Sequence, residues 1–361
     1  MNTKSVFQKV HLYIGLSTGV IVMIIAITGC LYAFQKELKY AFLPEYTANY
    51  KTDQLRLPLS KLFLDARAQT DLQIKMIYEF KDPQRNIILR MSDPKGELYH
   101  GFLNPYTGKL LKTTAYKDDF FEVVQSLHRT LLLGEIGEQI IGIAVFLFLI
   151  SLISGIYLWF PKKWTKRIRK NQFRVSWKSP GAKRNYDLHK VGGFYAAFFL
   201  ILIASTGLAW NQEWFNDLLY SAVTFEKKPI EKPLEFPETD FNAEALNKVK
   251  VYAEQNTQNR NLFLYRIPST KGQELKVYAY PNYDSYGSLD LFYARSDNGQ
   301  ILLKQWDKDR NRGNKFRRLF YDIHTGSILG IFGKILVFFM ALIAASLPLS
   351  GLIMYLDKRR N

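Results

Sequence analysis

A histidine-headed apolar segment occurs twice in this chain. Residues 9–34 read KVHLYIGLSTGVIVMIIAITGCLYAF, and residues 185–211 read NYDLHKVGGFYAAFFLILIASTGLAWN. Superposition aligns His11 with His189, Gly15 with Gly193, and Thr28-Gly29 with Thr206-Gly207, with the same offset at every matching position. Matches at one fixed offset over so long a stretch indicate a tandem duplication.

Four apolar runs are each long enough to cross a lipid bilayer as a helix. They cover residues 12–34, 140–160, 191–210 and 328–356. A helix needs about 20 apolar residues to span the hydrocarbon core. We therefore predict a multi-pass membrane protein, although the mean hydropathy of −0.13 is that of a polar chain.

The distribution of positive charge predicts the orientation of the chain. Residues 162–190 hold eleven lysines and arginines against a single acid, Asp187, and Lys358-Arg359-Arg360 precede the C-terminal Asn361. Short basic loops stay in the cytoplasm, so we expect both termini and this loop there. The two long polar segments would then lie in the periplasm of a bacterium, with the chain in the inner membrane. The basic loop suits the anionic headgroups of the lipid bilayer, and no nucleic-acid-binding motif accompanies it.

Cys30 is the single cysteine of the chain. One cysteine excludes a disulfide framework, a zinc cluster, an iron–sulfur site and covalent attachment of c-type haem. Residues 27–30, ITGC, are similar to a lipoprotein cleavage box. The apolar run continues to residue 34, however, and the second copy has Leu208 at the cysteine position, so we expect an uncleaved anchor. We interpret Thr-Gly, present in both copies, as a helix-packing element.

The polar segments between the apolar runs predict two small α+β modules. Each module has a helix, at residues 59–68 or 243–254, followed by four short strands. The turn before the last strand is N-P-Y-T-G at residues 104–108 and D-N-G at residues 297–299. The predicted strands are 74–80, 86–91, 98–103 and 109–113 in the first module, and 262–267, 275–280, 289–294 and 300–304 in the second.

The predicted fold is an α-helical membrane protein with four transmembrane helices in two parallel repeats, each carrying an extracytoplasmic α+β module. Parallel repeats imply a pseudo-twofold axis along the membrane normal. The expected segments are a first transmembrane helix (1–36), the first module (37–126), a second helix (127–160), a basic cytoplasmic loop (161–188), a third helix (189–211), the second module (212–322), and a fourth helix with a basic C-terminus (323–361).

Four of the five histidines head the four membrane helices at matching positions of the repeats. His11 and His189 enter from the cytoplasmic side, and His128 and His324 from the outer side. The twofold axis lets the members of each pair face one another across a ligand. Opposed imidazoles suit the axial positions of a low-spin haem iron, whereas zinc or copper would want thiolates or carboxylates nearby, which matching positions lack. The alternative is interfacial histidines bonded to headgroups or loop carbonyls.

Residues near each pair suit a porphyrin ring. Gly15 and Gly193 lie one helical turn after their histidines and leave room for the ring. The basic side chains expected to pair with haem propionates are Lys9, Lys190, Arg129, Arg317 and Arg318. We predict two haem b groups per chain, one near each surface of the membrane.

Several polar residues leave alternatives open. A continuous helix from His128 to the apolar run would place the outer haem at or above the headgroups, about 18 Å out. Glu138 and Lys334, at matching positions, could pair across the axis or lie in the interface. His100 breaks the symmetry, because Leu291 stands at its aligned position; it would be an exposed strand histidine or a substrate contact.

These motifs resemble the PepSY-associated transmembrane family, the iron-regulated inner-membrane proteins that include bacterial ferric-siderophore reductases. The resemblance covers nearly the whole chain. It rests on the two His-x3-Gly segments with their Thr-Gly pairs, on Leu127-His128-Arg129, on His324-Thr325-Gly326, and on the two modules, which look like PepSY domains. The N-P-Y-T-G turn is similar to the typical turn of that domain, and D-N-G is a looser copy.

The resemblance implies electron transfer from a cytoplasmic-side haem to an outer haem, and then to a ferric chelate or siderophore in the periplasm, which releases Fe(II). Residues 308–318 hold six lysines or arginines, which could steer an anionic chelate or balance haem propionates. The loop at 161–188 is too short for a flavin or nicotinamide domain, and no dinucleotide fingerprint occurs. We therefore expect quinol or a separate reductase as the electron donor, and no oxidation of NADH by this chain alone.

Three other functions compete with this one. A haem-free regulatory protein, whose modules contact another envelope protein or a protease, leaves the four matched histidines unexplained. A permease for an iron complex has little room in four helices without a broken or charged interior. A reductase of another periplasmic substrate stays open, because no motif names the substrate.

Overall fold

The computed structural model describes residues 2–48, 54–229 and 236–360; parts of the predicted segments 1–36, 37–126, 212–322 and 323–361 therefore lie outside the described residues. The chain forms two compact units, each assembled from separate stretches of sequence. The membrane unit comprises Met1–Phe34, Val123–Leu219 and Phe320–Asn361, and the sheet unit comprises Gln35–Glu122 and Tyr220–Leu319.

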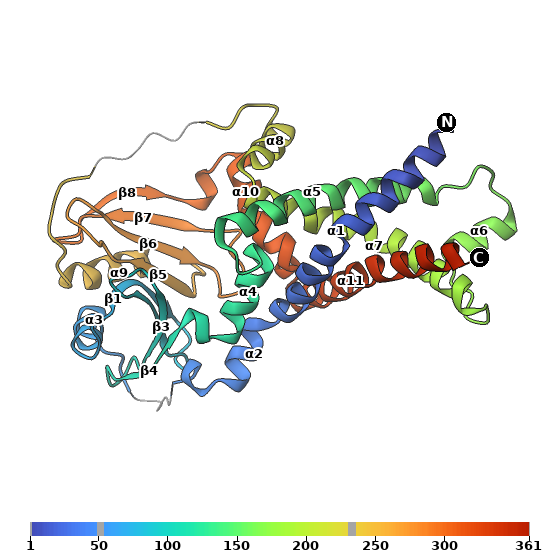
Figure 1. Cartoon of the computed structure of the whole chain (residues 1–361). Helices are drawn as coiled ribbons and strands as arrows, with labels where there is room; N and C mark the ends of the chain where they lie inside the picture. The colour runs from blue at the N-terminus through green and yellow to red at the C-terminus, as the bar shows by residue number, and fades with distance from the viewer. Residues whose placement is uncertain (1, 49–53, 230–235, 361) are drawn as a thin grey trace. The chain divides into compact units, whose positions relative to one another are not determined.

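Four long apolar helices make up the membrane unit (Figure 1). They are α1 (Thr3–Ala33), α5 (Gly134–Trp159), α7 (Gly181–Asn211) and α11 (Gly330–Arg360). The helices of the duplicated segment, α1 and α7, each pack against both α5 and α11. Short side chains such as Ala26, Ala196 and Ala344 in the buried cluster let the helices approach closely. The chain is a multi-pass membrane protein, as predicted.

The first turn of α1, the last turns of α11 and the short helix α6 (Lys166–Phe173) lie at the same end of the membrane unit (Figure 1). The basic loop is anchored there by aromatic contacts. The Trp159 indole N–H donates to the carbonyl of Gln172 at 3.3 Å, and the Phe173 ring lies 5.0 Å from the Trp159 ring. The loop is therefore a folded cap on this end of the helices.

Short helices precede α5 and α11, and each carries one of the outer histidines. These are α4 (Phe120–Thr130) and α10 (Arg312–Thr325). The backbone then breaks, with positive φ at Gly134 (58°) and Gly330 (61°), a conformation that glycine adopts without steric cost. The expected continuous helix through His128 is therefore wrong, because the chain turns between the histidine and the apolar run.

Gly137 and Gly333 allow these breaks to close. A Cβ on Gly137 would overlap the carbonyl oxygen of Thr130, the last residue of α4. A Cβ on Gly333 would likewise overlap the carbonyl oxygen of Gly326. The matching glycines six and nine residues after each outer histidine thus form one helix-break motif, used in both halves of the chain.

The described strands form one antiparallel sheet with the order β4-β3-β2-β1-β5-β6-β7-β8. All eight lie within two residues of their predicted bounds. They are β1 (Gln73–Phe80), β2 (Ile87–Ser92), β3 (Leu98–Leu103), β4 (Leu110–Ala115), β5 (Leu262–Arg266), β6 (Leu275–Tyr280), β7 (Asp290–Ala294) and β8 (Ile301–Gln305).

The two predicted modules share this sheet, which the sequence analysis did not foresee. The first strand of each module is an edge, and the two edges pair antiparallel, with Phe80 opposite Leu262 and Tyr78 opposite Leu264. An unpaired edge leaves a row of backbone donors and acceptors without partners. Pairing β1 with β5 satisfies both edges and joins the two halves of the chain.

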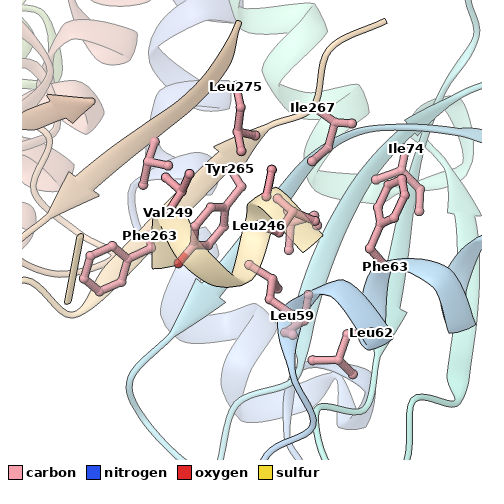
Figure 2. Packing of buried hydrophobic residues seen from close by; sticks show 14 of the residues in the cluster. Leu59, Leu62, Phe63, Ile74, Leu246, Val249, Phe263, Tyr265, Ile267 and Leu275 are labelled. Carbon is pink, nitrogen blue, oxygen red and sulfur yellow. The ribbon is translucent and has the colours of Figure 1, made fainter. Parts of the chain in front are cut away.

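Two helices, α3 (Leu59–Ala68) and α9 (Glu244–Asn256), pack against one another and cover one face of the sheet. Figure 2 shows Leu59 and Leu62 of α3 and Leu246 of α9 among side chains from the strands. Complete burial of one such side chain contributes about 1.5–3 kcal/mol. This layer is the core of the sheet unit.

The opposite face of the sheet is aromatic. Its buried residues include Phe80, Phe102 and Leu264, and partly buried tyrosines pack against them, Tyr78, Tyr278 and Tyr280 among them. The remaining elements are α2 (Gln35–Phe42), α8 (Glu213–Thr224) and single 3-10 turns at Pro44–Tyr46, Tyr116–Asp118, Asp307–Asp309 and Ser327–Leu329.

Gly108, in the N-P-Y-T-G turn, provides a test of how the strands are fixed to α3. Its φ is +69°, and a Cβ there would overlap the carboxylate of Asp65. We expect Gly108→Ala to lower the free energy of unfolding by more than about 1 kcal/mol, because both the backbone and the overlap oppose a side chain. Denaturant unfolding of the full chain in detergent measures this loss.

Gly96→Ala is the matched control. Gly96 has a φ of +89°, but a Cβ there has nothing within 4 Å. In this variant, the free energy of unfolding should fall only by the cost of holding alanine at a positive φ, because the new methyl group overlaps no other atom. Equal losses in the two variants would contradict a tight contact between the turn and α3.

Candidate functional site

Two pairs of histidines face one another inside the membrane unit. His11 on α1 and His189 on α7 have ring centroids 6.2 Å apart, with the ring planes at 89°. His128 on α4 and His324 on α10 have ring centroids 6.1 Å apart, with the planes at 68°. Each pair takes one histidine from each half of the chain, so the structure brings together the residues that the duplication related.

The two pairs lie at different levels of α1. His11 is near the start of this helix, whereas His128 contacts Ile25 and Thr28 towards its other end. The 14 to 17 intervening residues correspond to about 21–26 Å of helix. The continuous helix on which the expected height of the outer haem rested is absent, because the break after α4 lets the His128 ring dock beside the apolar part of α1.

His128 is held on α1 by hydrogen bonds to its Nδ1 atom. This atom lies 2.8 Å from the carbonyl oxygen of Ile25 and 3.1 Å from Thr28 Oγ1. The equivalent contacts in the second half run from His324 Nδ1 to the carbonyl oxygen of Ile203, at 2.9 Å, and to Thr206 Oγ1, at 3.3 Å. Each outer histidine is therefore fixed by the long helix that begins its own half.

The inner histidines are held in the same way by the other helix of each half. His11 Nδ1 lies 3.0 Å from the carbonyl oxygen of Ser151 and 3.0 Å from Ser154 Oγ, both in α5. His189 Nδ1 lies 2.8 Å from Ser350 Oγ in α11. In the first half, α1 therefore holds His128 and α5 holds His11. In the second half, α7 holds His324 and α11 holds His189.

The hydroxyl groups determine which ring nitrogen carries the proton. Thr28, Thr206, Ser154 and Ser350 each donate their own hydroxyl proton to a carbonyl oxygen in the preceding turn. Such a hydroxyl, like a carbonyl, can only accept from the histidine, so every Nδ1 is the N–H. The Nε2 atom of each ring keeps its lone pair. Metal-binding histidines are usually oriented in this way by a second hydrogen bond.

A glycine follows each of these hydroxyl residues and lies against the imidazole ring. We call the four Ser/Thr-Gly pairs the histidine seats: Thr28-Gly29, Ser154-Gly155, Thr206-Gly207 and Ser350-Gly351. We measure each seat by the distance between a Cβ built on its glycine and the Cε1 atom of the histidine that it faces. This distance is 3.3 Å for Gly29 and His128, 3.1 Å for Gly155 and His11, 2.8 Å for Gly207 and His324, and 3.5 Å for Gly351 and His189. The Thr-Gly pairs, interpreted as helix-packing elements, have a more specific role, because their glycines leave room for the ring of a histidine on another helix.

The spacing of each pair fits one metal ion between the rings. An imidazole nitrogen binds a metal at about 2.0–2.1 Å and lies about 1.1 Å from the ring centre, so two opposed ligands have centroids about 6.2–6.4 Å apart. The observed spacings are 6.2 and 6.1 Å. Among the described residues, no third His, Cys, Asp or Glu joins either pair as a ligand. Any further ligands must come from a group that the ion brings with it.

The glycines predicted to clear a ring have space around them. A Cβ on Gly15 would have nothing within 4 Å, and one on Gly193 would meet only Leu347, at an ordinary 3.5 Å.

Lys334, at the start of α11, is 5% exposed, and its matching residue Glu138 is partly buried.

The basic residues predicted to pair with haem propionates differ in their exposure to solvent. Lys9 is exposed, as is Arg129 near the outer pair. Lys190 lies 3.5 Å from the Asp187 carboxylate and donates to the carbonyl of Asn171 at 2.6 Å. Lys190 therefore fastens the basic loop at residues 161–188. Arg317 and Arg318 belong to the sheet unit and are described below.

His100, on β3, is largely buried, so the interpretation as an exposed strand histidine is wrong. Its side chain is 13% exposed, its ring stacks on Tyr116 with centroids 4.3 Å apart, and its Nε2 lies 3.2 Å from Glu122 Oε1. Burial raises the pKa of Glu122, but the hydrogen bond from His100 and the charge of Lys39 outweigh it and lower that pKa to about 2. Glu122 is therefore ionised at neutral pH.

Lys39 completes this cluster from α2. Its ammonium is buried and lies 3.1 Å from Glu122 and 3.6 Å from Asp119. The spacing of His100, Asp119 and Glu122 would suit a metal ion, but Lys39 already supplies the positive charge. We interpret the cluster as a structural ion-pair network. Sequence reasoning missed it because its members come from three separate stretches with no common spacing.

A family model described as the PepSY-associated TM region matches residues 8–358 of this chain. The match includes both histidine pairs and all four histidine seats. No curated protein matches the chain.

The ion-pair network around Lys39 leads to a prediction about stability. Lys39→Met would leave Asp119 and Glu122 buried without their cation, and breaking a buried ion pair costs about 3–5 kcal/mol. Lys112→Met is the control, because Lys112 pairs with Glu45 at 2.6 Å but is 50% exposed, and exposed pairs contribute about 0–1 kcal/mol. Hydrogen exchange of the sheet unit in the full chain measures both losses. Equal losses would contradict the assignment.

Proposed function

We propose that this chain, which belongs to the PepSY-associated transmembrane family, holds two haem b groups in its membrane unit and passes electrons across the membrane to a ferric chelate. The observation that carries the proposal is the pair geometry: two imidazoles of fixed tautomer at the separation that one shared metal ion requires, built twice. A haem iron held by two imidazoles supplies one-electron oxidation and reduction.

The number of protein ligands favours haem over a bare ion. Each pair offers two imidazole nitrogens on opposite sides, and the described residues add no third ligand. Structural zinc takes four protein ligands, and catalytic zinc takes three. A haem would bring its remaining ligands with it, so His11 with His189 and His128 with His324 would each be enough to hold one haem iron. The open space beside Gly15 suits a porphyrin ring close to His11.

The separation of the two levels suits transfer across a bilayer. About 21–26 Å of α1 separates His11 from the seat of His128, and the hydrocarbon core is about 30 Å thick. One pair would therefore lie towards each surface of the membrane. His11 and His189 would hold the haem on the cytoplasmic side, and His128 and His324 the haem on the periplasmic side.

The charge distribution supports this orientation. The loop that contains α6 is strongly basic and short, and three basic residues, Lys358, Arg359 and Arg360, follow the last apolar run. Such segments stay in the cytoplasm. We propose that both termini are cytoplasmic, that the sheet unit lies in the periplasm as a pair of PepSY-like modules, and that the protein resides in the inner membrane of a bacterium.

The proposed reaction adds one electron to the Fe(III) of a chelate or siderophore and releases Fe(II). Oxygen ligands hold Fe(II) far less tightly than Fe(III), so reduction frees the iron for uptake. The donor would be membrane quinol or a separate reductase, because the cytoplasmic loop holds only the short helix α6 between α5 and α7 in the structure. Reduction of another periplasmic substrate would use the same haem sites.

The level assignment predicts which haem each histidine holds. His11→Ala or His189→Ala should remove the inner haem alone, and His128→Ala or His324→Ala the outer haem alone, since each iron loses one of its two axial ligands. Haem per chain and reduced spectra of the purified variants measure this. Loss of both haems from every single variant would contradict two independent sites.

The histidine seats predict a graded effect of adding one methyl group. Gly207→Ala places a Cβ 2.8 Å from His324 Cε1, and Gly155→Ala places one 3.1 Å from His11 Cε1. We expect Gly207→Ala to weaken binding of the outer haem, and Gly155→Ala to weaken binding of the inner haem. The expected loss of affinity is about 10–100-fold, as for other changes around a metal-ligating histidine. Titration of haem into the apoprotein measures the affinities.

The repeat supplies matched controls for this series. Gly351→Ala, at 3.5 Å from His189 Cε1, makes only an ordinary contact and should leave the inner haem bound. Gly29→Ala, at 3.3 Å from His128 Cε1, should disturb the outer haem less than Gly207→Ala. A reversed order within either pair of glycines would contradict the role of the seats.

A further inference from the structure

Three arginines lie close together in the sequence of the sheet unit, and two of them have buried, unsatisfied donors. They are Arg310, just before α10, and Arg317 and Arg318 in its second turn. The Nε and Nη2 atoms of Arg310 and the Nε atom of Arg317 are buried, and each lacks a hydrogen-bond partner among the described residues. Buried polar atoms in folded proteins are nearly always hydrogen-bonded, so each exception calls for an explanation.

Two buried cations elsewhere in the sheet unit, Arg260 and Lys39, have carboxylate partners. Arg260 lies 2.7 Å from Asp290, and Lys39 lies 3.1 Å from Glu122. The arginine cluster differs, because burial lowers the pKa of Arg318 and the charge of Arg310 lowers it further. The positive charges of Arg310 and Arg317 therefore oppose the charged form of Arg318. Buried charges of one sign are stable only when an opposite charge joins them.

The carboxylate of Asp307 acts on this cluster, and it does not balance the three positive charges. Asp307 accepts a hydrogen bond from Ser288 at 2.9 Å through Oδ2, and its Oδ1 atom is buried without a partner. Asp307 can offset one of the three positive charges. About two charges and several N–H donors are left for a ligand.

The backbone around Arg310 is held in place. The Arg310 N–H donates to the carbonyl of Asp307 at 3.2 Å, and the Asn311 side chain donates to the Tyr220 hydroxyl at 3.2 Å. A Cβ on Gly313 would overlap the Tyr220 ring, so this glycine allows α10 to approach α8 closely. The guanidinium of Arg310 is thus presented from a fixed segment, which favours a built site over a solvated loop.

Tyr280 adds a neutral donor to the cluster. Burial raises its pKa to about 12, against the opposing charges of Arg318 and Arg310, so its phenol stays protonated. Tyr278 lies on the same face of β6, and strand register places it in one row with Leu264 and Tyr78. The cluster therefore borders the aromatic face of the sheet. Guanidinium and phenol donors beside aromatic rings suit an organic anion with several oxygen atoms.

We propose that Arg310, Arg317, Arg318 and Tyr280 form a binding site for the carboxylate groups of a ligand. Arginine presents two parallel N–H donors that match the two oxygens of a carboxylate. Two sources share this chemistry: an anionic ferric chelate such as ferric citrate, and the propionates of a haem. The chelate as the source rests on the proposed function, whereas the carboxylate site itself does not.

The test compares variants of the full chain in detergent. Arg310→Gln and Arg317→Gln each remove one guanidinium with buried donors, and Arg312→Gln removes the same charge at an exposed position of the same helix. Ferric citrate is titrated while the unfolding temperature is recorded, because a ligand that binds the folded state raises that temperature. Haem per chain is measured on the same samples.

We expect ferric citrate to raise the unfolding temperature of the wild type and of Arg312→Gln, with at least tenfold weaker binding in Arg310→Gln and Arg317→Gln. Unchanged haem content in these two variants would identify the chelate as the source. Reduced haem content, with no change in citrate binding, would identify the propionates. If both readouts are the same in Arg310→Gln, Arg317→Gln and Arg312→Gln, the site is refuted.

The two proposals fail separately in this design. A wild-type protein without haem that still binds ferric citrate through Arg310 and Arg317 would contradict the dihaem function and support the carboxylate site. Both variants are expected to fold, because each removes a repelling charge. Their unfolding temperatures without ligand, at or above that of the wild type, check this point.

Discussion

The hydrogen bond from each histidine Nδ1 to a neighbouring helix is the interaction on which the membrane unit depends. It fixes the tautomer, leaves the Nε2 lone pair free and holds the ring beside that of the opposite half. Each half of the chain uses it twice and reciprocally: α1 holds His128, and α5 holds His11. The four seats consequently require both long helices of a half to pack in one register. The positions of the histidines therefore depend on the packing of the helices, and the hydrogen bonds to the histidines help to fix that packing.

The helix breaks and the joined sheet follow from this requirement. An outer histidine on a continuous helix could not reach the seat on α1 or α7, and the breaks at Gly134 and Gly330 allow it to do so. In the sheet unit, the pairing of β1 with β5 joins the same two halves through backbone hydrogen bonds. In each unit, the two copies of the duplicated sequence thus pack directly against one another.

Much of this architecture could be predicted from the sequence, because it depends on local patterns. Apolar runs of membrane length and alternating strands appear in single stretches, and the constant offset between copies indicated which histidines belong together. The helix breaks were missed because Leu131 and Leu132, both with positive φ, are residues that ordinarily continue a helix. The pairing of β1 with β5 was missed because edge-to-edge contacts leave no periodicity in either strand.

The errors at individual residues have the same origin. The role of Thr28-Gly29 as a seat for His128 was missed because small residues also suit helix packing in general, and only the position of His128 reveals the more specific role. His100 was expected on the surface because its partners Glu122 and Lys39 are remote in sequence. The basic run at 308–318 was noticed as charge, but the unsatisfied donors of Arg310 are a property of the folded chain alone.

The visible absorption spectrum of the purified full chain, oxidised and then reduced with dithionite, tests the central claim most directly when haem per chain is quantified on the same sample. The account predicts sharp b-type bands and about two haems per chain, since two bis-histidine sites are built into one polypeptide. A colourless protein from cells supplied with ample haem would contradict it and would favour a haem-free regulatory role for the same fold.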